Sequence, residues 1–142
     1  MSEGHYKGDG TPVGVENVRA PWFVVGTESD HVAPWKSVYK IHLLADSEVT
    51  FVLTSGGHNA GIVSEPGHPH RHFRHATHPG GRPYTDPDHW TQQAQPEDGS
   101  WWPRWHAWLV DKGSGEQIAP PPMGTAAYPA VADAPGEYVL QR

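Results

Sequence analysis

An aspartate and a histidine are the two residues of this sequence whose types and spacing best suit catalysis. Asp30 lies in the segment GTESDH (residues 26–31), and His58 lies in the segment SGGHNAG (residues 55–61). An imidazole can accept a proton from a nucleophile, while a neighbouring carboxylate fixes the tautomer of the ring and stabilises its charged form. The pair is therefore typical of the acid and the base of an acyl-transfer triad.

The segments around these two residues indicate how they are positioned. The apolar runs PWFVVGT (21–27) and VTFVLT (49–54) predict strands buried on both faces, as in a parallel sheet. Residues 34–46 between them carry apolar side chains at helical spacing, with a proline near the start. This order predicts a βαβ unit with parallel strands. Because such sheets form their sites at the carboxyl ends of the strands, Asp30 and His58 should lie at one edge, within roughly 8 Å of each other.

The sequence does not supply a nucleophile for this pair. In α/β-hydrolases the chain order is nucleophile, acid and then histidine. The sequence contains no cysteine and no Gly-x-(Ser/Cys)-x-Gly pentapeptide before Asp30. Two strands cannot form a stable parallel sheet alone, so we expect the other strands to lie outside this chain. The pattern predicts a partial α/β-hydrolase fold, formed by the C-terminal βαβ part of a larger enzyme.

The other segments divide the chain into three parts. Residues 61–85 are rich in His, Pro and Gly, which predicts a long, irregular and mobile loop. Residues 115–142 are rich in Pro and Ala and predict an extended arm, with a short strand at 138–140. We therefore expect an irregular lead-in (1–14), part of a catalytic domain (15–114) and a C-terminal arm (115–142).

Two helices are predicted before the arm. Asp86 is followed by a proline, which predicts a short helix to about Ala94. Ser100 is the expected cap of a second helix, which should end at Gly113. This helix carries closely spaced aromatic residues: Trp101, Trp102, Trp105 and Trp108. Their spacing favours packing in the core over a polymer-binding platform.

The composition restricts the partners of the chain. The net charge is −6 and there are only 10 Lys and Arg, which does not favour binding to nucleic acid or to an anionic membrane. No apolar run approaches the ~20 residues that span a bilayer, and residues 1–10 do not resemble a signal peptide, so a cytoplasmic location is the default. Hydrophobic residues make up only 36%, and 16 glycines and 15 prolines indicate long irregular stretches. We therefore expect the ordered part of the chain to lean on a partner surface. No pattern points to a cofactor.

Four motifs in order resemble segments of polyhydroxyalkanoate synthases. They are DHVAPW (30–35), SGGHNAGIV (55–63), GSWWPRW (99–105) and APGEYV (134–139). The first two resemble the segments around the catalytic Asp and His of that family. The chain looks most like the C-terminal end of a class I synthase.

The resemblance implies an α/β-hydrolase fold and a polymerase that uses a catalytic cysteine to join (R)-3-hydroxyacyl-CoA monomers into polyester, with release of free CoA. His58 matches the base that activates this cysteine, and Asp30 matches the acid that assists activation of the 3-hydroxyl group. His31 matches the histidine that follows this acid, with a structural or supporting role. The implied partners are acyl-CoA, the polyester chain and the N-terminal remainder of the synthase at the granule surface. The resemblance leaves open whether the chain forms a homodimer. Without a cysteine, the chain should be inactive alone.

Two alternative functions remain open at this point. One is a non-catalytic module that binds polyester granules or a synthase. The other is a metal-binding protein, because imidazoles at close spacing can hold zinc, nickel or copper. The histidines concerned are His68, His70, His72, His75 and His78. No carboxylate or thiolate lies inside this cluster, and its prolines oppose a preorganised helix face, so we assign it no metal.

Overall fold

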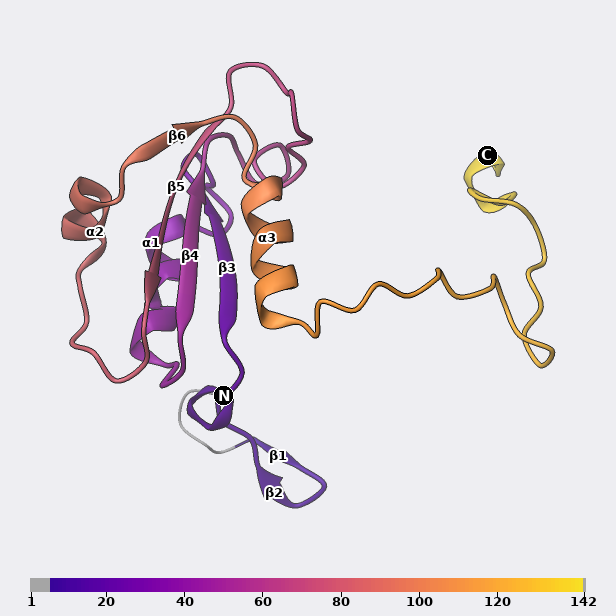
Figure 1. Cartoon of the computed structure of the whole chain (residues 1–142), viewed down its shortest axis with the longest axis horizontal. Helices are drawn as coiled ribbons and strands as arrows, with labels where there is room; N and C mark the ends of the chain where they lie inside the picture. Colours follow the sequence, from indigo (N-terminus) through magenta and orange to yellow (C-terminus); the bar gives the residue numbers. More distant parts are fainter. Residues whose placement is uncertain (1–5, 142) are drawn as a thin grey trace.

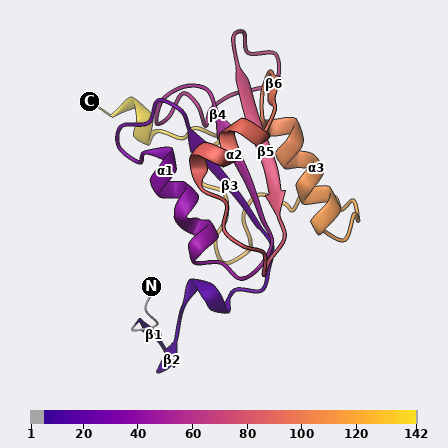
Figure 2. The same ribbon diagram turned by 90° about the vertical axis from the view of Figure 1, so that its left-hand side faces the viewer.

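A mixed four-stranded sheet with helices on both faces forms the body of the protein (Figures 1 and 2). The computed structural model describes residues 6–141. The strand order is β3-β4-β5-β6, and a small hairpin and a long arm lie outside the sheet. None of the described helices is long and apolar enough to cross a membrane.

The predicted strand, helix, strand unit is confirmed. β3 (Trp22–Thr27) and β4 (Val49–Thr54) are parallel and in register from end to end. The connection between them is α-helical over α1 (Trp35–Val38) and continues as a 3-10 helix, η2 (Tyr39–Leu43). The regular α-helix is thus shorter than the sequence predicts. The second half carries β-branched and aromatic residues, which lose side-chain freedom in an α-helix.

Two predictions about the next segment are wrong. Residues 61–85 are not irregular throughout, because β5 (His72–His78) pairs antiparallel with β4. The other strands of the sheet are also not all outside this chain, since β6 (Pro96–Asp98) pairs antiparallel with β5. β5 alternates between the two faces of the sheet, with Phe73 buried. The His-rich composition of β5 hides this strand pattern in the sequence. Because β5 pairs along the whole of β4, β4 has strand neighbours on both sides.

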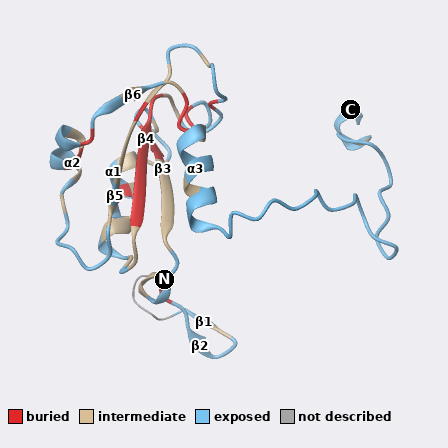
Figure 3. Ribbon diagram, viewed as in Figure 1, coloured by how far each residue is buried: buried red, intermediate tan, exposed pale blue. Residues whose placement is uncertain are grey.

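The core lies on both faces of β4, all six residues of which are buried (Figure 3). Phe51 and Leu53 face α1, η2 and α2, where they cluster with Tyr39 and Trp90. Val52 faces α3, where it clusters with Phe73 and Trp101. Successive strand residues point to opposite faces, so one strand organises both layers.

The helices after the sheet begin and end near the predicted positions. α2 (Pro87–Gln93) has Asp86 as its N-cap and proline as its first residue. α3 (Trp102–Lys112) ends at Gly113. Its N-cap residue is Trp101, one residue later than expected, but the Ser100 Oγ still accepts the Trp102 N–H at 3.0 Å.

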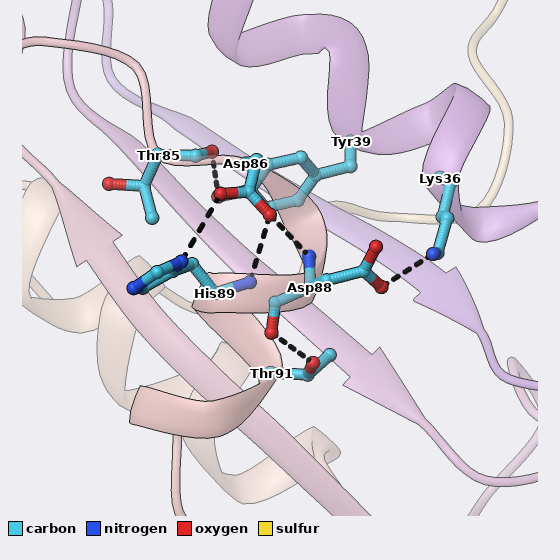
Figure 4. Close-up of polar contacts among 7 residues, drawn as sticks. All are labelled: Lys36, Tyr39, Thr85, Asp86, Asp88, His89 and Thr91. Carbon is cyan, nitrogen blue, oxygen red and sulfur yellow. Dashed lines mark hydrogen bonds and ion pairs between the residues drawn. The ribbon is translucent and has the colours of Figure 1, made fainter.

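Polar contacts at the start of α2 tie this helix to α1 (Figure 4). The Asp86 carboxylate accepts the N–H groups of Asp88 and His89, each at 3.0 Å, and also contacts the His89 ring at 3.4 Å. These backbone donors, that of His89 first, lower the pKa of Asp86. The Lys36 ammonium of α1 contacts the Asp88 carboxylate at 2.5 Å. α2 is thereby held over the same face of the sheet as α1.

The two ends of the described chain lie outside the sheet. The expected lead-in contains a hairpin of β1 (Lys7–Gly8) and β2 (Thr11–Pro12), followed by η1 (Val15–Asn17); residues 1–5 lie outside the described part. The arm beyond α3 is exposed and extends away from the body (Figure 1). The strand predicted near its end is instead a 3-10 helix, η3 (Tyr138–Leu140). Within residues 6–141 no strand pairs with this segment, and a lone strand is not stable.

A partly buried histidine, His42, should make the stability of this fold depend on pH. Both ring nitrogens of His42 are buried without a hydrogen-bond partner in the described chain, and burial lowers its pKa to about 4. In the unfolded chain the ring takes up a proton near its ordinary pKa of 6.5. The contribution of neutral His42 to stability is therefore complete above pH 6.5 and is lost as the pH falls towards 4. We predict that Tm falls less steeply over this range in His42→Leu than in the parent.

Thermal unfolding followed by circular dichroism at a series of pH values measures this slope. His106→Leu, at an exposed position of α3, is the matched control and should keep the parent slope. Parallel curves for the parent and His42→Leu would contradict the prediction.

Candidate active site

Asp30 lies in the turn after β3, where its carboxylate is almost enclosed. Oδ1 accepts the N–H groups of Val32 and Ala33, each at 2.8 Å. The Thr27 hydroxyl donates to Oδ2 at 3.4 Å, and the side chain is 7% exposed. The hydrogen bond from Ala33, followed by those from His58 and Val32, lowers the pKa of Asp30 to about 2. Asp30 is therefore ionised at neutral pH.

His58 lies in the loop after β4 and meets this carboxylate directly. Its Nδ1 is 2.8 Å from Asp30 Oδ2, so the predicted convergence of the two residues is confirmed. The imidazole is 48% exposed. An ionised carboxylate at Nδ1 favours a proton on that nitrogen, which leaves Nε2 as the proton acceptor. An imidazole held in one tautomer in this way can act chemically as a general base.

Backbone contacts hold the two loops side by side. The Ser29 N–H donates to the Gly56 carbonyl at 3.0 Å, which extends the contact of the two strands beyond their ends. Gly61 packs closely against Thr27: a Cβ atom added at Gly61 would lie only 2.5 Å from Thr27 Cγ2. Only glycine permits this approach. The loop that carries His58 therefore packs against Thr27, whose hydroxyl donates to Asp30.

A second carboxylate–imidazole pair at the same edge was not predicted. Glu28 Oε2 lies 3.1 Å from His72 Nε2, and the His72 N–H donates to the Ser55 hydroxyl at 3.1 Å. Glu28 follows β3 and His72 begins β5, which is antiparallel to β4 and so starts beside the carboxyl end of β4. The sequence hides this pair, because the composition of residues 61–85 predicts a loop where β5 lies.

The remaining candidates are not part of this cluster. His31 is exposed, and no hydrogen bond or ion pair joins its ring to another residue within 6–141; its supporting role stays a prediction. The five His-rich positions are dispersed, since strand alternation places His75 on the face opposite to His72 and His78. Four of them have separate partners: Glu65 for His68, Glu28 for His72, Glu97 for His75, and the Pro83 carbonyl for His78. Across the described residues, no three His, Asp or Glu side chains are grouped to hold a metal ion.

Comparison with known proteins places the chain beside one group of enzymes. It is 35% identical over 133 residues to poly(3-hydroxyalkanoate) polymerase 2 of Ectopseudomonas oleovorans, covering 94% of this chain and 23% of the relative. Identity to poly(3-hydroxyalkanoate) polymerase subunit PhaC is 34% over 131 residues in Cupriavidus necator and 36% over 134 residues in Rhizobium etli. These alignments cover 92% and 94% of this chain, and 21% and 20% of the relatives. No family model matches the chain.

The chain therefore spans about one-fifth of the length of the curated relatives it matches. The resemblance to polyhydroxyalkanoate synthases is confirmed: the chain is related, over nearly all its length, to a segment of these polymerases.

The low pKa of Asp30 should survive the loss of His58. The largest lowering cause is the Ala33 N–H, which belongs to the turn itself. We predict that the pKa of Asp30 in His58→Gln stays below its ordinary value of 3.8, although above the parent value of about 2. Titration of the carboxyl carbon by NMR measures both values. A pKa at or above 3.8 in His58→Gln would show that the turn does not stabilise the carboxylate.

Proposed function

We propose that this chain supplies the acid and the base of a polyhydroxyalkanoate polymerase, and that a cysteine nucleophile comes from the rest of the enzyme. The observation that carries this proposal is the 2.8 Å contact of His58 Nδ1 with Asp30 Oδ2 at the carboxyl edge of two parallel strands. The similarity of the chain to polymerases supports the reaction class.

In this proposal the chain forms the C-terminal part of an α/β-hydrolase sheet. The parallel pair β3 and β4 and the placement of the acid before the base agree with that fold. β3 is an edge strand of the described sheet, and its outer side pairs with no other described strand. The preceding strands of the enzyme would pair there, since an open edge has unpaired N–H and C=O groups.

His58 Nε2 performs the proton transfers of the proposed reaction. It accepts the proton of the cysteine thiol, and the thiolate attacks the thioester carbonyl carbon of a 3-hydroxyacyl-CoA. The bond from that carbon to the CoA sulfur breaks, and the proton passes from His58 to the departing sulfur. The hydroxyacyl group is then bound to the cysteine.

Chain growth uses the same nitrogen in the same way. The 3-hydroxyl group of one acyl unit attacks the thioester carbonyl of another, which forms an ester bond and breaks a carbon–sulfur bond. His58 takes the hydroxyl proton and gives it to the released thiolate, which becomes a thiol. Asp30 holds the ring, stabilises its charged form and assists activation of the hydroxyl group.

A chimera tests the proposal. In the polymerase of Cupriavidus necator, the segment that matches this chain is replaced by the chain, and CoA release from 3-hydroxybutyryl-CoA is measured. We predict turnover by the chimera and a loss of at least ~100-fold in kcat for His58→Gln, the usual size of a general-base effect. The chain alone, which has no cysteine, should release no CoA.

His68→Gln in the chimera is the matched control. His68 also contacts a carboxylate, that of Glu65 at 3.0 Å, but outside the cluster of Asp30 and His58. It should leave kcat unchanged. Full activity of the His58→Gln chimera, or turnover by the chain alone, would refute the proposed role.

A further inference from the structure

The Ser-Trp-Trp segment at the start of α3 makes hydrogen bonds that core packing does not explain. Trp101 packs in the core as predicted: it is 6% exposed, and its ring stacks on Phe23 with centroids 6.2 Å apart. The prediction is wrong for Trp105, which is 42% exposed. Trp102 is half-buried at the edge of the same cluster. Yet both indole N–H groups and the hydroxyl of Ser100 have their acceptors in a different part of the chain, the loop after His58.

Three consecutive side chains donate to three carbonyls of this loop. Trp101 Nε1 donates to the Gly61 carbonyl at 3.1 Å, and Trp102 Nε1 donates to the Ile62 carbonyl at 3.0 Å. The Ser100 hydroxyl donates to the carbonyl of Ser64, a fully buried residue. We call Ser100, Trp101 and Trp102 the clamp.

These carbonyls need donors because of the conformation that follows His58. The Gly61 N–H donates to the Gly57 carbonyl at 2.9 Å, and the Val63 N–H donates to the Asn59 carbonyl at 3.0 Å. The backbone thus makes a helical turn that does not continue. The last carbonyls of a helical turn have no partner within it, and the indole N–H groups supply partners here.

The clamp connects the core to His58 through this turn. Trp101 clusters with Val52 of β4, and its indole holds Gly61 at the point where this glycine presses on Thr27. Thr27 in turn donates to Asp30. Loss of the clamp would free the end of the turn and allow His58 to leave the carboxylate.

We infer that Ser100, Trp101 and Trp102 are positioning residues, which keep His58 Nδ1 on Asp30 through hydrogen bonds to the loop after His58. The importance of this role for catalysis rests on the proposed function, but the hydrogen bonds of the clamp and the position of His58 do not. It can therefore be tested in the chain as it exists, without any measurement of activity.

The experiment uses Trp→Phe replacements, which remove the indole N–H and keep an aromatic ring. Long-range 1H–15N spectra of the uniformly 15N-labelled chain report the tautomer of each imidazole. In the parent at a pH where His58 is neutral, His58 should show one tautomer, with the proton on Nδ1. In Trp101→Phe/Trp102→Phe it should show a mixture of tautomers, and exchange of the Val63 N–H with solvent should become roughly 30-fold faster, the change expected when two hydrogen bonds are lost.

Trp105→Phe is the matched control, because Trp105 lies on the same helix, packs near Trp101 with ring centroids 5.8 Å apart, and makes no hydrogen bond to a carbonyl of the loop among the described residues. It should match the parent in both measurements. Trp102→Phe alone leaves the buried core intact and should give a smaller change of the same kind, so the test does not depend on replacing the core residue Trp101. Parent-like spectra for Trp102→Phe and for the double variant, or an equal change in Trp105→Phe, would overturn the inference. An inactive chimera with an intact clamp would instead count against the proposed function.

Discussion

Parallel pairing of β3 with β4 brings the carboxyl ends of the two strands to the same level, and the contact of Asp30 with His58 depends on this. The register runs from Trp22 opposite Val49 to Thr27 opposite Thr54, so the turn and the loop that follow leave the sheet side by side. A slip of one residue would move one end by about 3.3 Å and turn its side chains to the opposite face. The 2.8 Å contact could not survive it.

Burial of β4 fixes this register, and backbone hydrogen bonds keep the enclosed Asp30 carboxylate ionised. β4 is buried on both faces, with Phe51 towards α2 and Val52 towards α3, so a slip would place residues on the wrong side of the core. Burying the Asp30 carboxylate would be costly without hydrogen bonds. The turn offsets this cost through two backbone N–H groups, which keep the acid ionised before any substrate binds.

The parts of the structure that follow local rules could be predicted from the sequence. Continuous apolar runs gave β3 and β4, and Asp86 before a proline gave the start of α2. The meeting of Asp30 and His58 followed from the strand ends. The pairing of Glu28 with His72 could not be predicted, because it depends on the antiparallel register of β5, whose histidines hide its alternation. The clamp depends on where two buried or half-buried indoles point, which spacing alone does not determine.

The central claim is that Asp30 and His58 act as one unit. A double-mutant cycle in the chimeric polymerase tests it most directly, with kcat for CoA release measured in Asp30→Asn, in His58→Gln and in the variant with both changes. If the carboxylate acts through the imidazole, the double variant loses no more activity than His58→Gln alone, since residues that act as a unit are not additive. Losses that multiply would show that the two residues work independently, and would contradict the account.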